Sequence, residues 1–300
     1  MPWKSLSKRE LRVNIRKTSF WLFGIVTVAL FAFQYNAIGD DVAAYLGPDA
    51  VILSLQSPLA LVLPLAGLLL GHRSVLDERT TGRIKLTAAM PHSRRDIVVG
   101  KTVSLAVPLV GLVFSSLAVA TVVAVVTEGV PSLLSLFGFA AVSVVYAIVC
   151  AGLGIAISVL ASSSLRATGA MLCGLLTVFL WKSLATRAYS TIAGVQVNPF
   201  DPPADGALFL VRRLDPRSAY MLVTNWVYGV GNVADTYAAA VSTLQAGDGT
   251  TVVSRVFIVG PTFRDSPVYL AESTGVVLLL GWLVVPLGIA IARFERTTLS

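Results

Sequence analysis

Five long stretches of this 300-residue chain carry no charged side chain, and they constrain its fold more than any other feature. A helix that crosses a membrane needs about 20 predominantly apolar residues. Charged residues make up 13% of the chain, whereas soluble domains carry about 25%. The mean hydropathy is +0.79. The sequence therefore predicts a membrane protein whose spans lie in the uncharged runs 18–39, 50–71, 102–127, 129–165 and 273–292.

A sixth span is predicted between residues 167 and 188. The apolar run that begins at Ala167 reaches only Trp181 before Lys182 interrupts it, which also suits a re-entrant or interfacial piece. A lysine at a helix end can extend its ammonium group toward the membrane surface, and this would let the span continue to Ala188. The predicted fold is an all-α membrane protein with six transmembrane helices, at about 18–38, 51–72, 102–127, 135–160, 167–188 and 273–292.

The basic residues predict the orientation, because cytoplasmic connections carry an excess of Lys and Arg. Six precede the first span and seven lie in the connection 73–101, whereas the connections 37–51 and 127–134 carry none. We therefore expect a multi-pass protein of the cell membrane with both termini cytoplasmic. The net charge of +7 is explained by these flanks, so no nucleic-acid partner is expected.

Residues 189–269 form a long connection on the opposite side and predict a small folded extracytoplasmic cap between helices 5 and 6. Prolines after Asn198, Asp201 and Asp215 mark turns or helix starts. Short helices are expected at 202–214, 218–230 and 233–244, and the β-branched run 250–262 predicts a strand pair or an extended piece. This divides the chain into 1–188, the cap 189–269, and 270–300 with the last span and a cytoplasmic tail.

Gly100-Lys101-Thr102 resembles the end of a phosphate-binding loop but lacks the rest of that motif. The first glycine of the motif would fall at position 95, which is Arg95. Ser93 and Asp96 instead form the pattern of a capping box that starts a helix. Lys101 then lies inside a helix at the membrane boundary, where we interpret it as an anchor on the cytoplasmic side.

The sequence shows no other arrangement of catalytic, cofactor-binding or metal-binding residues. The two histidines, His72 and His92, lie beside arginines, where a zinc site is disfavoured. Cys150 and Cys173 sit in apolar runs and are interpreted as core residues. Because the spans contain almost no ionisable residues, an ion-coupled carrier is disfavoured as well. We expect no cofactor in this chain and an energy source on another one.

Residues 3–17 predict a helix that lies on the inner membrane surface before the first span. On a helical wheel its basic side chains form a compact face opposite a broad apolar face. A solvated basic tail is the alternative. The residues of the basic face are Lys8, Arg9, Arg12 and Arg16.

The connection 73–101 places a short apolar segment between two charged clusters. Apolar side chains surrounded by charge suit docking into a groove of a partner protein. In the alternative, Ile84 and Leu86 simply rest on the bilayer. The candidate coupling residues are Glu78, Arg79, Gly82, Arg83, Ile84, Leu86, Pro91, Ser93, Arg94 and Arg95.

These residues resemble the membrane subunits of ABC-2 type exporters. In that family the connection between spans two and three carries a Glu-Arg pair, a glycine, apolar residues, Pro-x-Ser-Arg and then Gly-Lys. The sequence is also similar to the tail of such subunits at Arg293-Phe294-Glu295-Arg296. Within the family it looks closest to the nitrous-oxide-reductase maturation and sodium-efflux permeases. The sequence departs from the pattern at Thr81 and Arg83.

The resemblance implies a permease subunit that pairs with a second permease subunit, identical or related. Each would rest its inner connection on a separate ATP-binding subunit, which would hold the ATP and magnesium. When the ATP-binding subunits close on ATP, the spans would move between inward and outward openings. Two other functions stay open: a membrane anchor or assembly factor that moves no solute, and an intramembrane enzyme, which lacks candidate catalytic groups.

Overall fold

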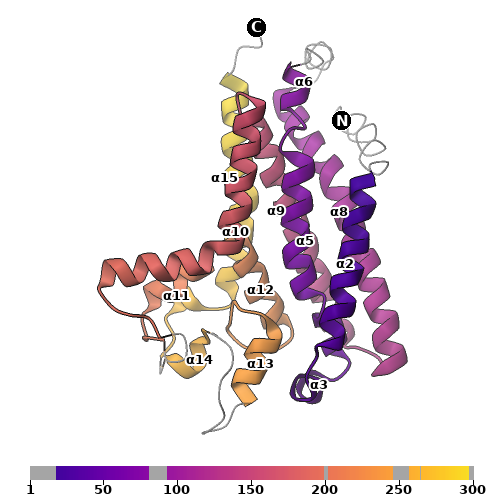
Figure 1. Cartoon of the computed structure of the whole chain (residues 1–300), viewed down its shortest axis with the longest axis vertical. Coiled ribbons are helices and arrows are strands. Elements are labelled where there is room, and N and C mark those ends of the chain that lie inside the picture. The colour runs from indigo at the N-terminus through magenta and orange to yellow at the C-terminus, as the bar shows by residue number, and fades with distance from the viewer. Residues whose placement is uncertain (1–17, 81–92, 199–201, 246–256, 264, 297–300) are drawn as a thin grey trace.

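The computed structural model describes residues 18–80, 93–198, 202–245, 257–263 and 265–296, and it is almost entirely helical. Long helices run alongside one another as a bundle, and shorter helices gather beside its lower half (Figure 1). The helices of the bundle are α2 (Thr18–Asn36), α3 (Asp40–Leu46), α4 (Asp49–Leu53), α5 (Gln56–Gly71), α6 (Leu76–Thr80), α8 (Arg94–Thr127), α9 (Leu133–Leu160), α10 (Ser164–Ala193) and α15 (Ser273–Arg296).

Five stretches among the described residues are long and apolar enough to cross a membrane, and they confirm an all-α membrane protein. The continuous stretch Asp49–Glu78 contains α4, α5 and the first part of α6, and the other four stretches are α8, α9, α10 and α15. The first predicted span corresponds to α2, whose apolar part Trp21–Asn36 is shorter. The five uncharged runs, together with the shorter run 167–181, therefore correspond to these six stretches.

The starts of α8, α9 and α10 follow local signals in the sequence. Ser93 accepts a hydrogen bond from the backbone N–H of Asp96, and the Asp96 carboxylate accepts one from the N–H of Ser93. This is the predicted capping box, which satisfies N–H groups at the helix start. Ser132 and Ser163 cap α9 and α10 in the same way with their hydroxyl groups.

Helix α9 lies at the centre of the bundle and packs against α5, α8, α15 and the short helix α12 (Pro216–Val227). Its contact with α5 is made through glycines, which let the two backbones approach closely. A Cβ atom added at Gly154 would lie 2.1 Å from the carbonyl oxygen of Gly67, and one at Gly71 would lie 2.8 Å from the Cα of Gly154. The Gly67-x-x-x-Gly71 pair is thus a packing face within this chain.

We expect Gly154→Ala to lower the free energy of unfolding by about 2–3 kcal/mol, because the added methyl group meets backbone that no rotamer change can move. Gly111→Ala is the matched control on a bundle helix, since nothing lies within 4 Å of its added Cβ. Alanine there is expected to stabilise the helix by about 1 kcal/mol. Thermal unfolding of both purified variants measures the difference, and equal losses of stability would contradict this packing.

The connection between α10 and α15 contains short helices joined by turns. Apolar side chains of this connection form a hydrophobic cluster separate from the core of the bundle. Its buried residues are Leu208, Phe209, Phe257, Val259 and Leu270. The predicted short helices are present with shifted ends. They are α11 (Gly206–Arg213), α12 (Pro216–Val227) and α13 (Tyr237–Gln245), followed by α14 (Val259–Thr262) and the 3₁₀ helix η1 (Val268–Leu270).

The predicted strand pair at 250–262 is wrong in the part that the structure describes. Ile258 makes an isolated antiparallel bridge to Val233, and the chain then turns into α14. Pro261 has no N–H to donate to a ladder, and β-branched composition is a weak preference that tertiary contacts override. The remaining residues of that prediction, 250–256, lie outside the described residues.

Helix α12 is inserted against the bundle instead of resting above it as a separate cap. It packs against α5, α9 and α15. The ring of Tyr220 stacks on that of Tyr146 of α9 with centroids 4.5 Å apart, and its hydroxyl lies 3.0 Å from that of Ser143. Tyr220 and Tyr228 are therefore core residues, whereas Trp226 is 48% exposed.

Candidate functional site

A buried ion pair closes the connection between α6 and α8. The Lys101 ammonium donates to Oε1 of Glu78 at 2.9 Å and to the carbonyl of Ser74 at 3.2 Å. The Lys101 side chain is only 1% exposed, and that of Glu78 is 20% exposed. The structure describes the side chain of Glu78, and no later charged side chain before the segment 81–92 is described. Helix α8 begins directly after that segment.

The interpretation of Lys101 as an anchor at the membrane surface is wrong. The capping box starts α8 at Arg94, and the helix then turns Lys101 toward α6. Burying an ammonium group requires a partner of opposite charge, and Glu78 supplies it. The sequence shows a glutamate and a lysine at the two ends of the same connection. It does not indicate that these two residues form a pair.

A serine of α9 holds the turn that leads into α6. The Ser158 hydroxyl accepts hydrogen bonds from the backbone N–H groups of Val75 and Leu76, at 2.8 and 3.1 Å. Ser158 is fully buried. These are N–H groups at the start of α6 that no helical carbonyl can satisfy. The base of the connection is thus fixed to the central helix as well as to α8.

Arg94 joins the start of α8 to the end of α15. Its guanidinium donates to the carbonyl oxygens of Phe294 and Glu295, at 2.7 and 3.1 Å. It also lies 5.8 Å from the centre of the Phe294 ring. A cation at the last carbonyls of a helix is favoured by the helix dipole. The tail of the chain and the connection 73–101 are therefore tied together.

The other predicted coupling residues have different positions. Ser93 caps α8 and Arg95 is exposed at its first turn. Arg79 lies in α6, and its side chain is not among those described. The remaining predicted residues of the connection and of the surface helix lie outside the described residues, so their roles stay predictions. They are Gly82, Arg83, Ile84, Leu86 and Pro91, and Lys8, Arg9, Arg12 and Arg16.

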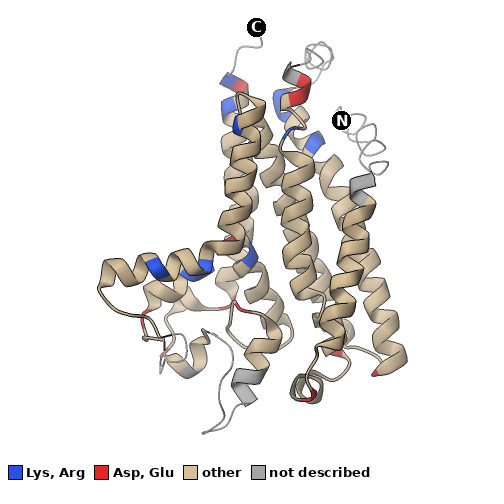
Figure 2. Cartoon of the chain, viewed as in Figure 1, with Lys and Arg blue, Asp and Glu red and all other residues tan. Residues whose placement is uncertain are grey.

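Charged residues are sorted between the two ends of the bundle. Figure 2 shows blue Lys and Arg positions gathered at the end that carries α6, whereas the opposite end at α3 shows only red ones. The acidic residues near that opposite end include Asp40, Asp49 and Glu128. Between these ends the upright helices are mostly tan, and further Lys and Arg positions lie on the part of α10 that turns away from the bundle. This separation is the one that the connection lengths and charges predicted.

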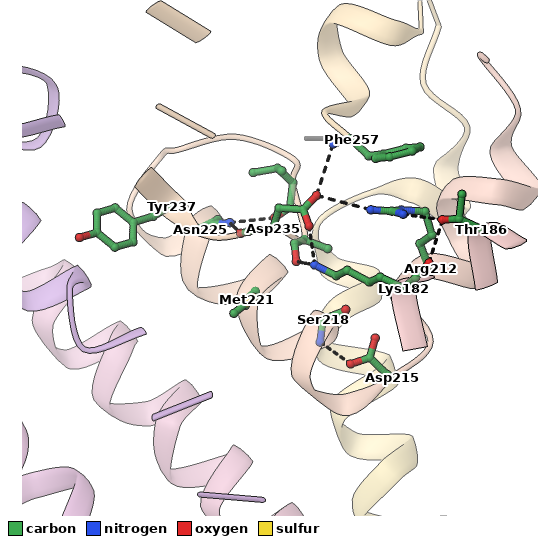
Figure 3. A network of polar contacts seen from close by, with 12 residues as sticks. Lys182, Thr186, Arg212, Asp215, Ser218, Met221, Asn225, Asp235, Tyr237 and Phe257 are labelled. Atoms are coloured by element: carbon green, nitrogen blue, oxygen red, sulfur yellow. Dashed lines mark hydrogen bonds and ion pairs between the residues drawn. The ribbon is translucent and has the colours of Figure 1, made fainter. Parts of the chain in front are cut away.

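A second polar network joins α10, α11 and the chain before α13 (Figure 3). Lys182 donates to Oδ1 of Asp235 at 2.6 Å and to the carbonyl of Ala234 at 2.5 Å. Arg212 lies 3.9 Å from the other Asp235 oxygen and 3.6 Å from the centre of the Phe257 ring. Arg212 also donates to the Thr186 hydroxyl at 2.6 Å.

Lys182 therefore does not extend its ammonium group to the membrane surface as predicted. Helix α10 continues through it to Ala193, and the second part of the helix turns away from the bundle to run beside α11 (Figure 1). Asp235 is 53 positions further along the chain. Because no carboxylate lies near Lys182 in the sequence, the sequence does not indicate that Lys182 pairs with Asp235.

Gln56 connects this network to α5. Its amide nitrogen donates to the Thr224 hydroxyl and to Oδ1 of Asn225, both at 2.7 Å, and its oxygen accepts from the N–H of Tyr237 at 3.0 Å. Asn225 in turn donates to the carbonyl of Asp235 at 2.8 Å. Polar contacts thus fix both ends of the α5–α6 stretch, through Gln56 at one end and Glu78 at the other.

The ion pairs of Asp235 lead to a prediction of how the stability of the fold depends on pH. Burial acts to raise the pKa of its carboxyl, but Lys182 and Arg212 outweigh burial, so the pKa is lowered overall. A carboxyl whose pKa is lower in the folded state stabilises the fold above its unfolded pKa of about 3.9. This contribution is lost as the pH falls further, through the folded pKa. Thermal unfolding followed from about pH 6 to pH 3 should show a stability loss that Asp235→Asn removes; an unchanged profile in the variant would contradict the pairing.

The hydrogen bonds and ion pairs of this arrangement hold helices together. Within the described ranges, no group of three or more His, Cys, Asp or Glu side chains could hold a metal ion. Cys150 is buried beside Gly67, and Cys173 is exposed on α10. The two polar networks instead clamp four bundle helices at the α6 end and the short helices at the other end.

The sequence was compared with known protein families and with curated proteins. The family described as "ABC-2 family transporter protein" matches residues 5–299, nearly the whole chain. No curated protein matches it.

Proposed function

The chain belongs to the ABC-2 family of transporter proteins, and from this premise we propose that it is the permease subunit of an ATP-driven exporter. Hydrolysis of ATP, with its magnesium ion, would take place on a separate ATP-binding subunit. A second permease subunit, a copy or a relative of this chain, would complete the pathway. The nitrous-oxide-reductase maturation and sodium-efflux branch stays a prediction about its nearest relatives.

The observation that carries this proposal is the buried Glu78–Lys101 pair at the base of the connection between α6 and α8. A connection that receives force from a partner must pass it to the spans without bending at its base. The pair joins the two ends of the connection at 2.9 Å, and the hydrogen bonds of Ser158 tie it to α9. Movement of the connection would therefore shift α5, α8 and α9 together.

The tail provides a second link of the same kind. Because Arg94 binds the last carbonyls of α15, a displacement at the start of α8 would also reach the final span. Residues 81–92 lie between these fixed ends, and we propose that Gly82, Ile84 and Leu86 contact the ATP-binding subunit. The exposed Arg95 would lie at the rim of that contact.

The charge separation supports an orientation with the α6 end in the cytoplasm. Lys and Arg gather at this end of the bundle, as expected for cytoplasmic connections (Figure 2). An ATP-binding subunit would have to bind on the same side. The surface helix predicted at 3–17 would lie on the inner leaflet beside it.

Co-purification with a co-expressed ATP-binding subunit of the ABC type tests the proposed partnership. We expect Gly82→Trp to reduce the recovered ATP-binding subunit at least about tenfold, because a bulky side chain in a docking contact costs more than about 1.4 kcal/mol. Gly169→Trp is the matched control, since Gly169 is exposed on α10 with nothing within 4 Å of an added Cβ.

Equal recovery with Gly82→Trp and the control would remove the assigned role of the connection. Reconstitution of the complex in vesicles then separates a transporter from an anchor or assembly factor. ATP-dependent movement of a solute across the membrane supports the permease function, and intact assembly without any such movement supports the anchor.

A further inference from the structure

The second part of α10 turns away from the bundle and exposes one face along its length (Figure 1). Two rows of exposed side chains lie next to each other on this face, and within each row the spacing is four residues. Residues four positions apart lie on the same side of a helix. The apolar row is Leu184, Ala188 and Ile192, and the polar row is Ser183, Arg187 and Thr191.

The opposite face of this part is held by the short helices. Ala185 is only 5% exposed, and the Thr186 hydroxyl accepts from Arg212 of α11 at 2.6 Å. The Tyr189 hydroxyl donates to the Asp205 carboxylate at the start of α11. Figure 1 shows α11 on the side of this part that is remote from the α6 end. The exposed face therefore points back toward the level of the spans.

The length of α10 places this face at a membrane surface. Near its start, Ala167 packs with Leu76 of α6, so the helix begins at the α6 end. Lys182 lies 18 positions after Ser164, the first residue of α10. At about 1.5 Å per residue this is about 27 Å, close to the thickness of about 30 Å of the hydrocarbon core. The second part thus begins at the membrane surface opposite the α6 end.

The composition of the exposed face fits the boundary between hydrocarbon and water. Leu184 and Ile192 are 51% and 87% exposed, which is unfavourable in water. Arg187 is exposed beside them, which is unfavourable within the hydrocarbon. None of the other described residues forms an ion pair or a hydrogen bond with its guanidinium group. Only at the level of the lipid head groups are both rows favourable at once.

The apolar row is continuous with the exposed surface of the spanning part. Leu172, Leu176 and Leu180 precede it at the same spacing of four residues and are 51%, 58% and 47% exposed. They belong to a helix that is apolar enough to cross the membrane. The surface that meets the acyl chains along the span therefore leads directly into the row Leu184, Ala188 and Ile192.

We propose that the second part of α10 lies in the plane of the membrane surface opposite the α6 end. Its apolar row lies among the upper acyl chains, and Arg187 binds the phosphate groups of phospholipids, with a preference for anionic ones. Lys182 does not take this role, because its ammonium binds Asp235 and Ala234. The proposal rests neither on the transport function nor on which membrane surface is cytoplasmic.

Depth-dependent fluorescence quenching tests the position of the helix on the full chain in lipid nanodiscs. Cys150 and Cys173 are replaced by Ala, and single cysteines introduced by Leu184→Cys, Ala188→Cys and Ile192→Cys carry a small fluorophore. The quenchers are phospholipids with a nitroxide on the head group or at one of two depths along the acyl chain. We expect all three labels to report the same depth, in the upper acyl chains.

Labels in the spanning part of the same helix give the matched comparison. Leu172→Cys and Leu176→Cys should report deeper positions that differ by about 6 Å, because four residues of a helix along the membrane normal rise by that distance. Depths that change in the same stepwise manner from Leu184 to Ile192 would overturn the in-plane helix.

The role of Arg187 is tested with a label at Thr191, its neighbour in the polar row. Phosphatidylglycerol and phosphatidylcholine that carry the same nitroxide are compared as quenchers. We expect about fivefold stronger quenching by phosphatidylglycerol, because one basic residue near the surface enriches anionic lipid by about that factor. Arg187→Gln should remove the preference, and Arg187→Lys should keep it. Equal quenching by the two lipids in the unsubstituted chain would overturn the phosphate contact.

Two other results would assign the exposed face to a different occupant. Quenching of the Leu184 and Ile192 labels by iodide in the buffer, without quenching by lipid, would place the face in water and overturn the proposal. Protection of the same labels from both quenchers, with energy transfer between labelled copies, would show that a second copy of the chain covers the face, and would overturn it as well.

Discussion

Glu78→Ala is expected to lower the free energy of unfolding by about 3 kcal/mol, because it leaves the buried Lys101 ammonium without its carboxylate. The loss lies at the lower end of values for buried pairs, since Glu78 is 20% exposed while Lys101 is 1% exposed. We also expect the variant to insert into the membrane and to lose ATP-driven export. Thermal unfolding of the purified variant measures the first effect, and transport by the reconstituted complex measures the second.

Asp77→Ala is the matched control, since it removes the neighbouring carboxylate from a pair with Arg73 whose side chains are 49% and 55% exposed. An exposed pair contributes about 0–1 kcal/mol, so the control should change stability little. The double variant Glu78→Leu, Lys101→Met should recover much of the stability, because an apolar pair can replace a buried ion pair. Similar stability losses for Glu78→Ala and Asp77→Ala would contradict the role of the pair.

Asp235→Ala is expected to cost about 4 kcal/mol, because it removes the partner of two cations at once. Lys182 loses its ion pair, Arg212 loses its nearest carboxylate, and the N–H of Phe257 loses its acceptor at 3.3 Å. The polar network that joins α10, α11 and the chain before α13 then lacks the carboxylate that its donors share. Unfolding measured by heat or denaturant should show a large loss, accompanied by easier proteolysis of the connection between α10 and α15.

The control in that connection is Asp265→Ala, which changes an exposed carboxylate and should leave stability within about 0.5 kcal/mol. Asp235→Asn should fall between the two, since its amide keeps one acceptor but removes the charge. If Asp235→Ala proved as mild as Asp265→Ala, the connection would not depend on this ion pair.

The sequence predicted the helices well because their signals are local. An uncharged run of sufficient length locates a span without knowledge of its neighbours, and the Ser93–Asp96 capping box locates the start of α8. The charge difference between the two ends was equally visible. Each of these signals lies within a few residues of the feature that it predicts.

The partners of the buried charges could not be predicted, because they lie far apart in the chain. Lys101 was interpreted as an anchor and Lys182 as a side chain at the membrane surface. Lys101 is instead buried against Glu78, and Lys182 is partly buried against Asp235. The insertion of α12 against α9 was missed for the same reason: Tyr220 resembles any interfacial aromatic residue until Tyr146 is beside it.

The central claim is that the connection 81–92 lies on the cytoplasmic side and is covered by an ATP-binding subunit. A membrane-impermeant maleimide tests it directly on Gly82→Cys, with Cys150 and Cys173 replaced by Ala. We predict no labelling from outside intact cells, labelling after the membrane is opened, and protection when its ATP-binding subunit is co-expressed. Labelling of Gly82→Cys from outside intact cells would contradict the claim.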